Sequence, residues 1–261
     1  MVLTIGRGLA LAAGGAAVVQ WTPALAAHVP RLATAFAIPR TIPSKRGVLL
    51  SFDDGPHRQG TPAVLAGLAR AGAPAVFFVV GEQVVRYPEL VREIAAAGHE
   101  IGVHGYRHQT RREWTRGLLA GDTRRALDAV HEAGGPRPRF YRPPHGVFSL
   151  GGLRCVRSLG LEPLLWSRWG RDWEGRATAT SIAERATTGV RAGDVVLLHD
   201  ADHYGAAGSW QKTAAALPRI FDQIAAAGLE ATSVRDATEN RGRLGGPIRG
   251  PQSPVALAVV P

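Results

Sequence analysis

The feature that most constrains the fold is an alternation of short apolar runs with helix-like stretches from Lys45 onward. The apolar runs predict strands at 47–52, 75–80, 100–103, 139–141, 162–166, 194–198 and 229–233. Helices are predicted between them, for example at 62–71, 88–97, 116–133 and 213–227, each followed by a glycine typical of a helix C-cap (Gly72, Gly98, Gly134, Gly228). About seven repeats predict a parallel α/β fold and favour a barrel. The alternative, an open doubly wound sheet, is disfavoured because no glycine-rich dinucleotide fingerprint follows a strand.

The two ends of the chain differ from this alternating region. Arg7, an apolar run from Gly8 to Val19, and Ala24-Leu25-Ala26 make residues 1–26 resemble a secretory signal peptide. The run is too short to span a bilayer comfortably, so we predict export without a stable membrane span; an uncleaved surface helix and a cytoplasmic location are the alternatives. Residues 27–44 are expected to be a linker, 45–238 the main domain and 239–261 a Gly/Pro-rich tail.

Composition limits the class of partner. Apolar residues make up 45% and charged residues 20% of the 261 residues, as in a globular protein. The net charge of +10 is carried almost wholly by arginine, which indicates either an anionic partner or a compositional bias. Without a lysine–arginine block, no nucleic-acid partner is predicted. The single cysteine, Cys155, excludes an intramolecular disulfide and a cysteine zinc knuckle, and we expect it in the core.

Two adjacent carboxylates, Asp53 and Asp54, follow the first predicted strand. Gly55-Pro56 then forces a turn, so both side chains lie where the strand stops. Neighbouring carboxylates repel each other unless a cation binds one of them or they share a proton. The pair therefore suggests divided roles, with one aspartate as metal ligand and the other as base; the alternative is an ordinary Asp-Gly turn.

Other polar residues follow other predicted strands, and in a parallel barrel such residues converge on one face. They are His104, His108, Arg142, Asp172, His199 and Asp200. If residues 104–108 form one helical turn, both histidine rings face the same way. Two histidines and one carboxylate are a common ligand set for catalytic zinc, whereas a surface loop with two exposed histidines is the alternative.

Charge pairing suggests roles for the remaining residues. Asp172 can hydrogen-bond an imidazole such as that of His199 and hold it protonated, as a general acid requires. Arg142 can pair with Asp53 and keep it ionised. The backbone N–H of His145 could contribute to an oxyanion site.

Five blocks of the sequence, in order between residues 45 and 235, resemble the motifs of the polysaccharide deacetylases, the NodB-like domain of carbohydrate esterase family four. They are Ser51-Phe52-Asp53-Asp54-Gly55-Pro56, His104 to His108, Arg142-Pro143-Pro144-His145-Gly146, Asp172-Trp173 and Leu197-Leu198-His199. The resemblance implies a distorted (β/α)7-type barrel, a NodB homology domain. It also implies a hydrolase that removes acetyl groups from a glycan.

The resemblance assigns a role to each matched residue. Asp53 would be the base that acts on metal-bound water, and His199 the acid. Arg142 would tether Asp53, and Asp172 would tune His199. The metal, most often zinc, would be held by Asp54, His104 and His108. His145, Trp173 and Leu197 would form the substrate-binding wall.

Several functions are compatible with this site. We predict N-deacetylation of an envelope polysaccharide or oligosaccharide; the alternatives are an O-acetyl esterase on xylan-like glycans and an amidase on a small non-sugar amide. A non-catalytic glycan binder is disfavoured because all the matched motif residues are present. The sequence predicts no oligomeric state.

The chain departs from the family pattern at two places. Gly105 replaces the usual hydroxyl residue of the second motif, and Trp169 replaces an acidic residue three positions before Asp172. The aromatic and arginine-rich stretch 166–173 predicts either a sugar-stacking groove or packing at the barrel rim. His203 and Tyr204 are expected near the mouth of the barrel, where substrate contact is one interpretation and a simple loop position the other.

Overall fold

The structure is a computed structural model that describes residues 19–109 and 116–237. Most of the expected signal peptide and the whole expected tail, 239–261, lie outside the described residues. The barrel begins with β1 (Gly47–Asp53), α3 (Gly60–Ala71), β2 (Ala75–Val79), α4 (Gly81–Arg86), α5 (Pro88–Ala96), β3 (Glu100–Val103), α6 (Arg116–Glu132) and β4 (Phe140–Tyr141). It continues with η3 (Pro144–Gly146), α7 (Leu150–Ser158), β5 (Glu162–Pro163), β6 (Arg168–Trp169), α8 (Ala179–Thr187), β7 (Val195–His199), α9 (Ser209–Ala226) and β8 (Glu230–Ala231).

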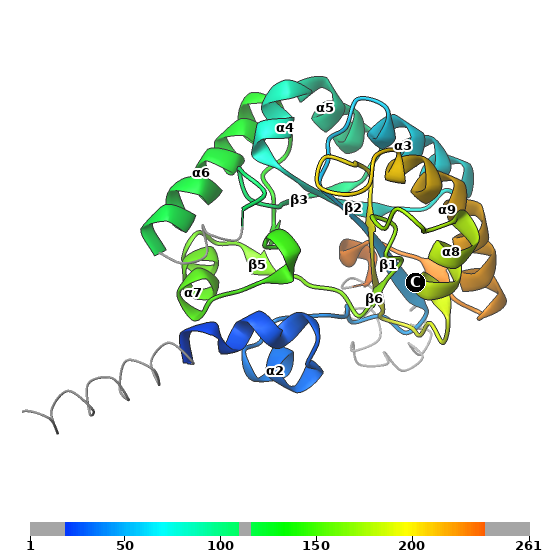
Figure 1. The fold of residues 1–261 in the computed structure, drawn as a ribbon, viewed down its shortest axis with the longest axis horizontal. Helices are drawn as coiled ribbons and strands as arrows, with labels where there is room; N and C mark the ends of the chain where they lie inside the picture. Colours follow the sequence, from blue (N-terminus) through cyan, green and yellow to red (C-terminus); the bar gives the residue numbers. More distant parts are fainter. Residues whose placement is uncertain (1–18, 110–115, 238–261) are drawn as a thin grey trace, which may run out of the picture.

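The strands form one parallel sheet in the order β5-β4-β3-β2-β1-β7-β6, with β8 also paired to β1. Helices lie along the outside of the curved sheet (Figure 1). This confirms the predicted parallel α/β fold and its distorted barrel. Every residue of the central strand β1 is buried, as expected for a strand covered on both faces.

The predicted helix ends agree with the structure. Gly72, Gly98, Gly134 and Gly228 all have positive φ, the conformation that closes a helix and that glycine adopts without strain. Cys155 is buried in α7, as expected for a core residue.

The barrel wall has a seam between β5 and β6, which form no ladder with each other in the described part of the chain. The apolar run predicted as one strand at 162–166 leaves the sheet after Pro163. Beyond that point the N–H of Leu165 donates to the carbonyl of Pro39 at 2.9 Å. The guanidinium of Arg142 donates to the carbonyls of Leu164 and Leu165, each at 3.0 Å. The seam is therefore closed by a side chain and by a segment that precedes the barrel.

That segment, which spans the end of the expected signal peptide and the expected linker, packs against the barrel. It contains η1 (Thr22–Ala27) and α2 (Pro30–Ala35), and α2 lies on the side of the barrel away from α4 and α5 (Figure 1). Ala33, Ile38 and Ile42 are buried, and the N–H of Ile42 donates to the carbonyl of Gly193 at 2.8 Å. The structure differs from the expected linker because these apolar residues cover the seam.

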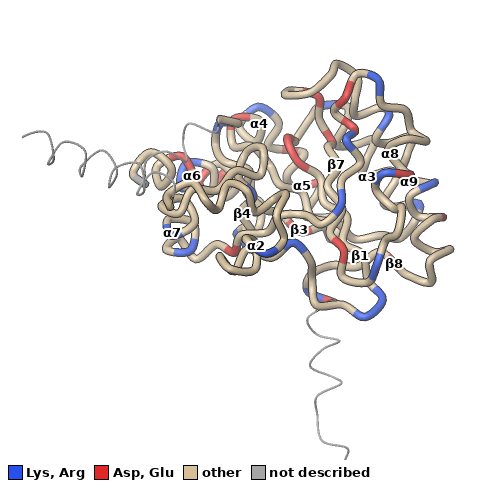
Figure 2. The backbone as a smooth tube through the Cα atoms, turned by 60° about the horizontal axis from the view of Figure 1, so that its bottom comes forward, with Lys and Arg blue, Asp and Glu red and all other residues tan. Residues whose placement is uncertain are grey.

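The basic residues of the described ranges are not confined to one element. Lys and Arg positions are spread over several elements, as are the acidic ones (Figure 2). Among the described residues, no helix is long and apolar enough to cross a membrane.

Candidate active site

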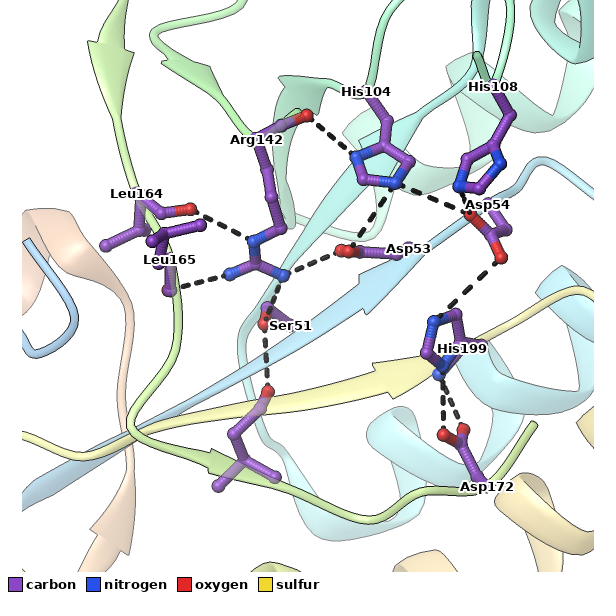
Figure 3. A network of polar contacts seen from close by, with 11 residues as sticks. Ser51, Asp53, Asp54, His104, His108, Arg142, Leu164, Leu165, Asp172 and His199 are labelled. Carbon is purple, nitrogen blue, oxygen red and sulfur yellow. Dashed lines mark hydrogen bonds and ion pairs between the residues drawn. The ribbon is translucent and has the colours of Figure 1, made fainter. Parts of the chain in front are cut away.

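The polar residues at the carboxyl ends of the strands meet in one cavity of about 260 Å³. Because β1 and β7 are parallel neighbours, their register places Asp53 directly beside His199. The close-up in Figure 3 shows the carboxylates and imidazoles turned toward one another. The cavity is lined by Asp53, Asp54, His104, His108, His145, Gly146, Trp166, Trp169, Trp173, Leu197, His199 and Tyr204.

Asp54 leaves the strand in a left-handed conformation, with φ of 78°, which turns its carboxylate toward the histidines. Its Oδ1 is buried and has no hydrogen-bond partner among the described residues. The same atom lies 3.5 Å from Nε2 of His104 and 3.4 Å from Nε2 of His108. Burial raises the pKa of Asp54 to about 7, because a buried carboxylate without a donor favours its neutral form.

The two histidines do not lie on the helical turn on which the sequence argument depended. A loop follows β3, and Gly105 bends it with φ of 82°. Nδ1 of His104 hydrogen-bonds the carbonyl of Arg142 at 2.8 Å, so Nε2 faces Asp54. Burial lowers the pKa of both His104 and His108. Each ring is therefore neutral and has a nitrogen lone pair that can bind a metal.

Ring packing holds His108 in place. The ring of Tyr204 stacks on it with centroids 4.2 Å apart and an interplanar angle of 12°. The ring of His145 contacts it edge-on at 4.5 Å. The Tyr204 hydroxyl donates to Oε1 of Glu82 at 2.8 Å, which fixes the tyrosine from its far end.

Arg142 is fully buried beside Asp53. One guanidinium nitrogen donates to Oδ1 of Asp53 at 2.7 Å and to the hydroxyl of Ser51 at 2.9 Å. Burial raises the pKa of Asp53, and the guanidinium opposes that rise by stabilising the ionised carboxylate. The other carboxylate oxygen of Asp53, Oδ2, lies 3.8 Å from Nε2 of His104.

His199 forms the second charged pair of the site. Oδ1 of Asp172 lies 2.9 Å from its Nδ1, and the other carboxylate oxygen accepts from the His199 backbone N–H and from the Thr213 hydroxyl, both at 2.7 Å. Burial alone would lower the pKa of His199, but the carboxylates of Asp172, Asp54 and Asp53 together outweigh it and raise this pKa to about 10. The imidazolium Nε2 points into the cavity, 3.9 Å from Oδ2 of Asp54.

The three residues expected on the substrate side also line the cavity. Leu197 is buried, and Trp173 contacts the ring of His199 edge-on at 5.2 Å. His145 lies in η3 with a left-handed φ of 58°. The residues given a role at this site thus line the cavity or, like Arg142 and Asp172, hydrogen-bond a residue beside it, whereas Asp200 does not line the cavity and accepts a hydrogen bond from Thr61.

The sequence argument missed three supporting residues. Ser51 accepts a hydrogen bond from Arg142, and Thr213 donates one to Asp172. Glu82 accepts a hydrogen bond from Tyr204. Ser51 belongs to the first motif block, but the sequence argument gave it no role. Glu82 and Thr213 are surrounded by helix-like sequence without any motif, and no sequence signal distinguishes them.

A second group of His57, Asp202 and His203 lies close enough to suggest a cation site. However, Nδ1 of His57 accepts the backbone N–H of Gly60 at 2.9 Å, so the ring hydrogen is on Nε2, which faces Asp202 at 3.3 Å. Oδ2 of Asp202 accepts the N–H of Gly208 at 2.7 Å. These hydrogen bonds fasten the loop that carries Tyr204 and leave His57 without a lone pair for a metal.

Known glycan deacetylases and a carbohydrate esterase are similar to this chain in sequence or fold. The polysaccharide deacetylase family profile matches residues 40–164. A chitooligosaccharide deacetylase of Bradyrhizobium sp. (strain ANU 289) is 34% identical over 63% of this chain and 77% of its own length. A peptidoglycan-N-acetylglucosamine deacetylase of Bacillus cereus is 30% identical over 78% of this chain and 71% of its own length.

A solved structure gives the same result. The family 4 carbohydrate esterase from Streptomyces lividans, in complex with acetate, superposes with a TM-score of 0.65 and 28% identity. That match covers 74% of this chain and 96% of the esterase. The chain belongs to the polysaccharide deacetylase family and is an enzyme of that family.

Proposed function

We propose that this enzyme is a metal-dependent N-deacetylase of an envelope polysaccharide or oligosaccharide built on N-acetylglucosamine. The observation that carries the proposal is the buried, unpartnered Oδ1 of Asp54 facing the Nε2 atoms of His104 and His108. A carboxylate oxygen and two neutral imidazoles form the donor set that zinc takes at catalytic sites. The relatives named above act on chitooligosaccharide and peptidoglycan, which supports this class of substrate.

A divalent cation at Asp54, His104 and His108 would act as a Lewis acid toward an acyl oxygen and lower the pKa of water. Zinc suits this ligand set best, although the set also accepts other first-row metals. His104 is oriented for the role by its hydrogen bond to the Arg142 carbonyl, which fixes the ring tautomer.

Asp53 and His199 supply the proton transfers in this proposal. Oδ1 of Asp53 is occupied by Arg142, so Oδ2 is the atom that accepts a proton from the attacking water. His199 is held protonated by Asp172 and donates from Nε2 to the departing sugar nitrogen. The His145 N–H is the proposed oxyanion donor, and Leu197 and Trp173 enclose the acetyl methyl group.

We also propose that the enzyme is exported and that residues 45–238 form its catalytic domain. Relatives that act on peptidoglycan support an envelope location. O-acetyl xylan and small non-sugar amides are the competing substrates, because the same groups can hydrolyse an ester or another amide.

The deciding experiment measures acetate released from N-acetylglucosamine oligomers, peptidoglycan and acetylated xylan by metal-stripped and zinc-restored enzyme. We expect zinc-dependent release from the N-acetylated substrates and a loss of about 10²-fold or more in kcat for Asp53→Asn, which removes the base. Asp222→Asn, which changes an exposed carboxylate on α9 to a carboxamide, is the matched control. Equal rates of acetate release before and after zinc is restored would contradict the role of the metal. Acetate release from xylan alone would show that the substrate is an O-acetylated glycan and not an N-acetylated one.

A further inference from the structure

The cavity extends beyond the proposed acid and base into an aromatic wall. Ring centroids are 5.2 Å apart for His199 and Trp173, 5.6 Å for Trp173 and Trp169, and 6.0 Å for Trp169 and Trp166. Trp166 and Trp169 both line the cavity, but Trp166 is only 5% exposed and belongs to the core, whereas Trp169 is half-buried. An acetyl group beside His199 can contact Trp173, but Trp169 lies one ring further out.

Two polar side chains flank Trp169, and they come from distant parts of the sequence. The ring of His28, just after η1, contacts Trp169 edge-on with centroids 5.7 Å apart. Cζ of Arg171 lies 5.8 Å from the Trp169 centroid, and its guanidinium is held by Oε1 of Glu174 at 2.6 Å. A half-buried aromatic ring with hydrogen-bond donors beside it matches a sugar, which offers C–H groups on its faces and hydroxyls at its edge.

The N-terminal segment is packed well enough to hold His28 at this place. Gly146 of η3 has no Cβ, and one placed there would lie 3.3 Å from Cβ of Ala27 and 2.5 Å from the ring of Trp166. The side chain of Arg40 donates to the carbonyl of Trp166 at 2.9 Å. Residues on both sides of His28 are therefore anchored to the wall that carries Trp169.

We propose that Trp169, flanked by His28 and Arg171, is a second sugar-binding position that takes the residue next to the acetylated one in a glycan chain. The proposal rests on the proposed function, which supplies the glycan. It makes Trp169 a specificity-determining residue that favours longer chains, and it makes the N-terminal segment part of the substrate site.

The test compares binding and turnover along a series of N-acetylglucosamine oligomers of increasing length. Trp169→Ala and His28→Ala are measured against Trp210→Ala, a half-buried tryptophan on α9, and His131→Ala, an exposed histidine on α6. Trp169→Leu is added because it keeps apolar bulk at the rim should the alanine variant fail to fold. Calorimetric titration is carried out in the Asp53→Asn background, so that binding is measured without turnover.

We expect Trp169→Ala and Trp169→Leu to weaken binding of the longer oligomers by about three- to tenfold, with a matching rise in KM and little change in kcat. The shortest substrates and both control variants should behave like the unaltered enzyme. Longer oligomers bound equally well with and without Trp169 would overturn the proposal, even if acetate release confirms the function. Conversely, length-dependent binding that needs Trp169 would uphold it even if no oligomer released acetate, in which case only the proposed function would fail.

Discussion

At the scale of single residues, the site is built from groups that burial alone would neutralise. Asp53 keeps a charged partner in Arg142, and His199 keeps one in Asp172. Oδ1 of Asp54 has no hydrogen-bond partner among the described residues and faces two neutral imidazoles instead, while Oδ2 lies 3.9 Å from Nε2 of His199. This contrast separates the proposed proton-transfer groups from the proposed metal ligands.

Tyr204 allows the packing of His108 to be tested. Tyr204→Phe keeps the ring that stacks on His108 and loses the hydroxyl that donates to Glu82 and accepts from Gln83, whereas Tyr204→Leu also loses the stack. We expect Tyr204→Leu to weaken zinc affinity by about tenfold, as the loss of other supporting contacts around metal ligands does, and Tyr204→Phe to weaken it less. Competition with a chromogenic chelator measures this, and equal affinities for the two variants would show that the stack does not orient His108.

Asp200 makes a separate prediction about pH. Its carboxylate is buried and accepts a hydrogen bond from Thr61, and burial raises its pKa to about 7. An unfolded aspartate has a pKa of about 3.9, so between about pH 4 and 7 the native state retains a proton that the unfolded state has released. The contribution of Asp200 to stability is therefore full at low pH and is lost as pH rises through about 7.

Asp200→Asn removes this titration. From pH 4 to pH 8, the unfolding free energy of Asp200→Asn should rise relative to that of the unaltered enzyme. Urea denaturation of the two metal-free proteins measures this difference. Asp222→Asn, at an exposed position, serves as the control. A pH-independent difference would mean that Asp200 is ionised in the native state throughout.

At the scale of elements, the wall of the site depends on close approach between short segments. Gly146 of η3 has φ of 71°, and its missing Cβ leaves room for the Trp166 ring. Gly72 has a similar φ of 59°, but nothing lies within 4 Å of the position its Cβ would take. The pair therefore separates backbone strain from steric conflict.

Gly146→Ala should destabilise the protein more than Gly72→Ala does. The strain of a left-handed alanine costs about 1 kcal/mol at either site. Displacement of the Trp166 ring should add about 1–3 kcal/mol at Gly146 alone and lower kcat/KM. Denaturant unfolding and acetate release measure the two effects, and identical losses in both variants would show that the wall tolerates the extra methyl group.

At the scale of the whole molecule, the segment before β1 is part of the barrel. Pro39 and Ile42 hydrogen-bond the backbone at Leu165 and Gly193, and one guanidinium nitrogen of Arg157 donates to the carbonyls of Phe36 and Ala37, both at 2.7 Å. These contacts cover the seam between β5 and β6, which the sheet itself leaves open.

Removing this segment should therefore destabilise the enzyme. We expect a chain that starts at residue 45 to unfold at a temperature at least several degrees below one that starts at residue 19, because buried apolar surface becomes exposed. Differential scanning calorimetry compares the two. Equal midpoints would show that residues 19–44 are dispensable for stability, as a linker would be.

The strand and helix alternation, the glycine caps and the residues at strand ends could all be predicted from the sequence. Each depends on local physics: the period of apolar residues, the conformational freedom of glycine and the rule that parallel strands end on one face. Asp53, Asp54 and His199 were found in this way, because their position directly after an apolar strand is a property of the chain itself.

Other features were decided only by the tertiary structure. The stacking of Tyr204 on His108, the use of Arg142 to close the seam and the packing of residues 19–44 all join segments far apart in the sequence. A helical turn for residues 104–108 was a reasonable local expectation, but the loop at Gly105 places both rings against Asp54 instead. Such contacts depend on which surfaces the barrel leaves uncovered, and those surfaces cannot be predicted from a local pattern of residues.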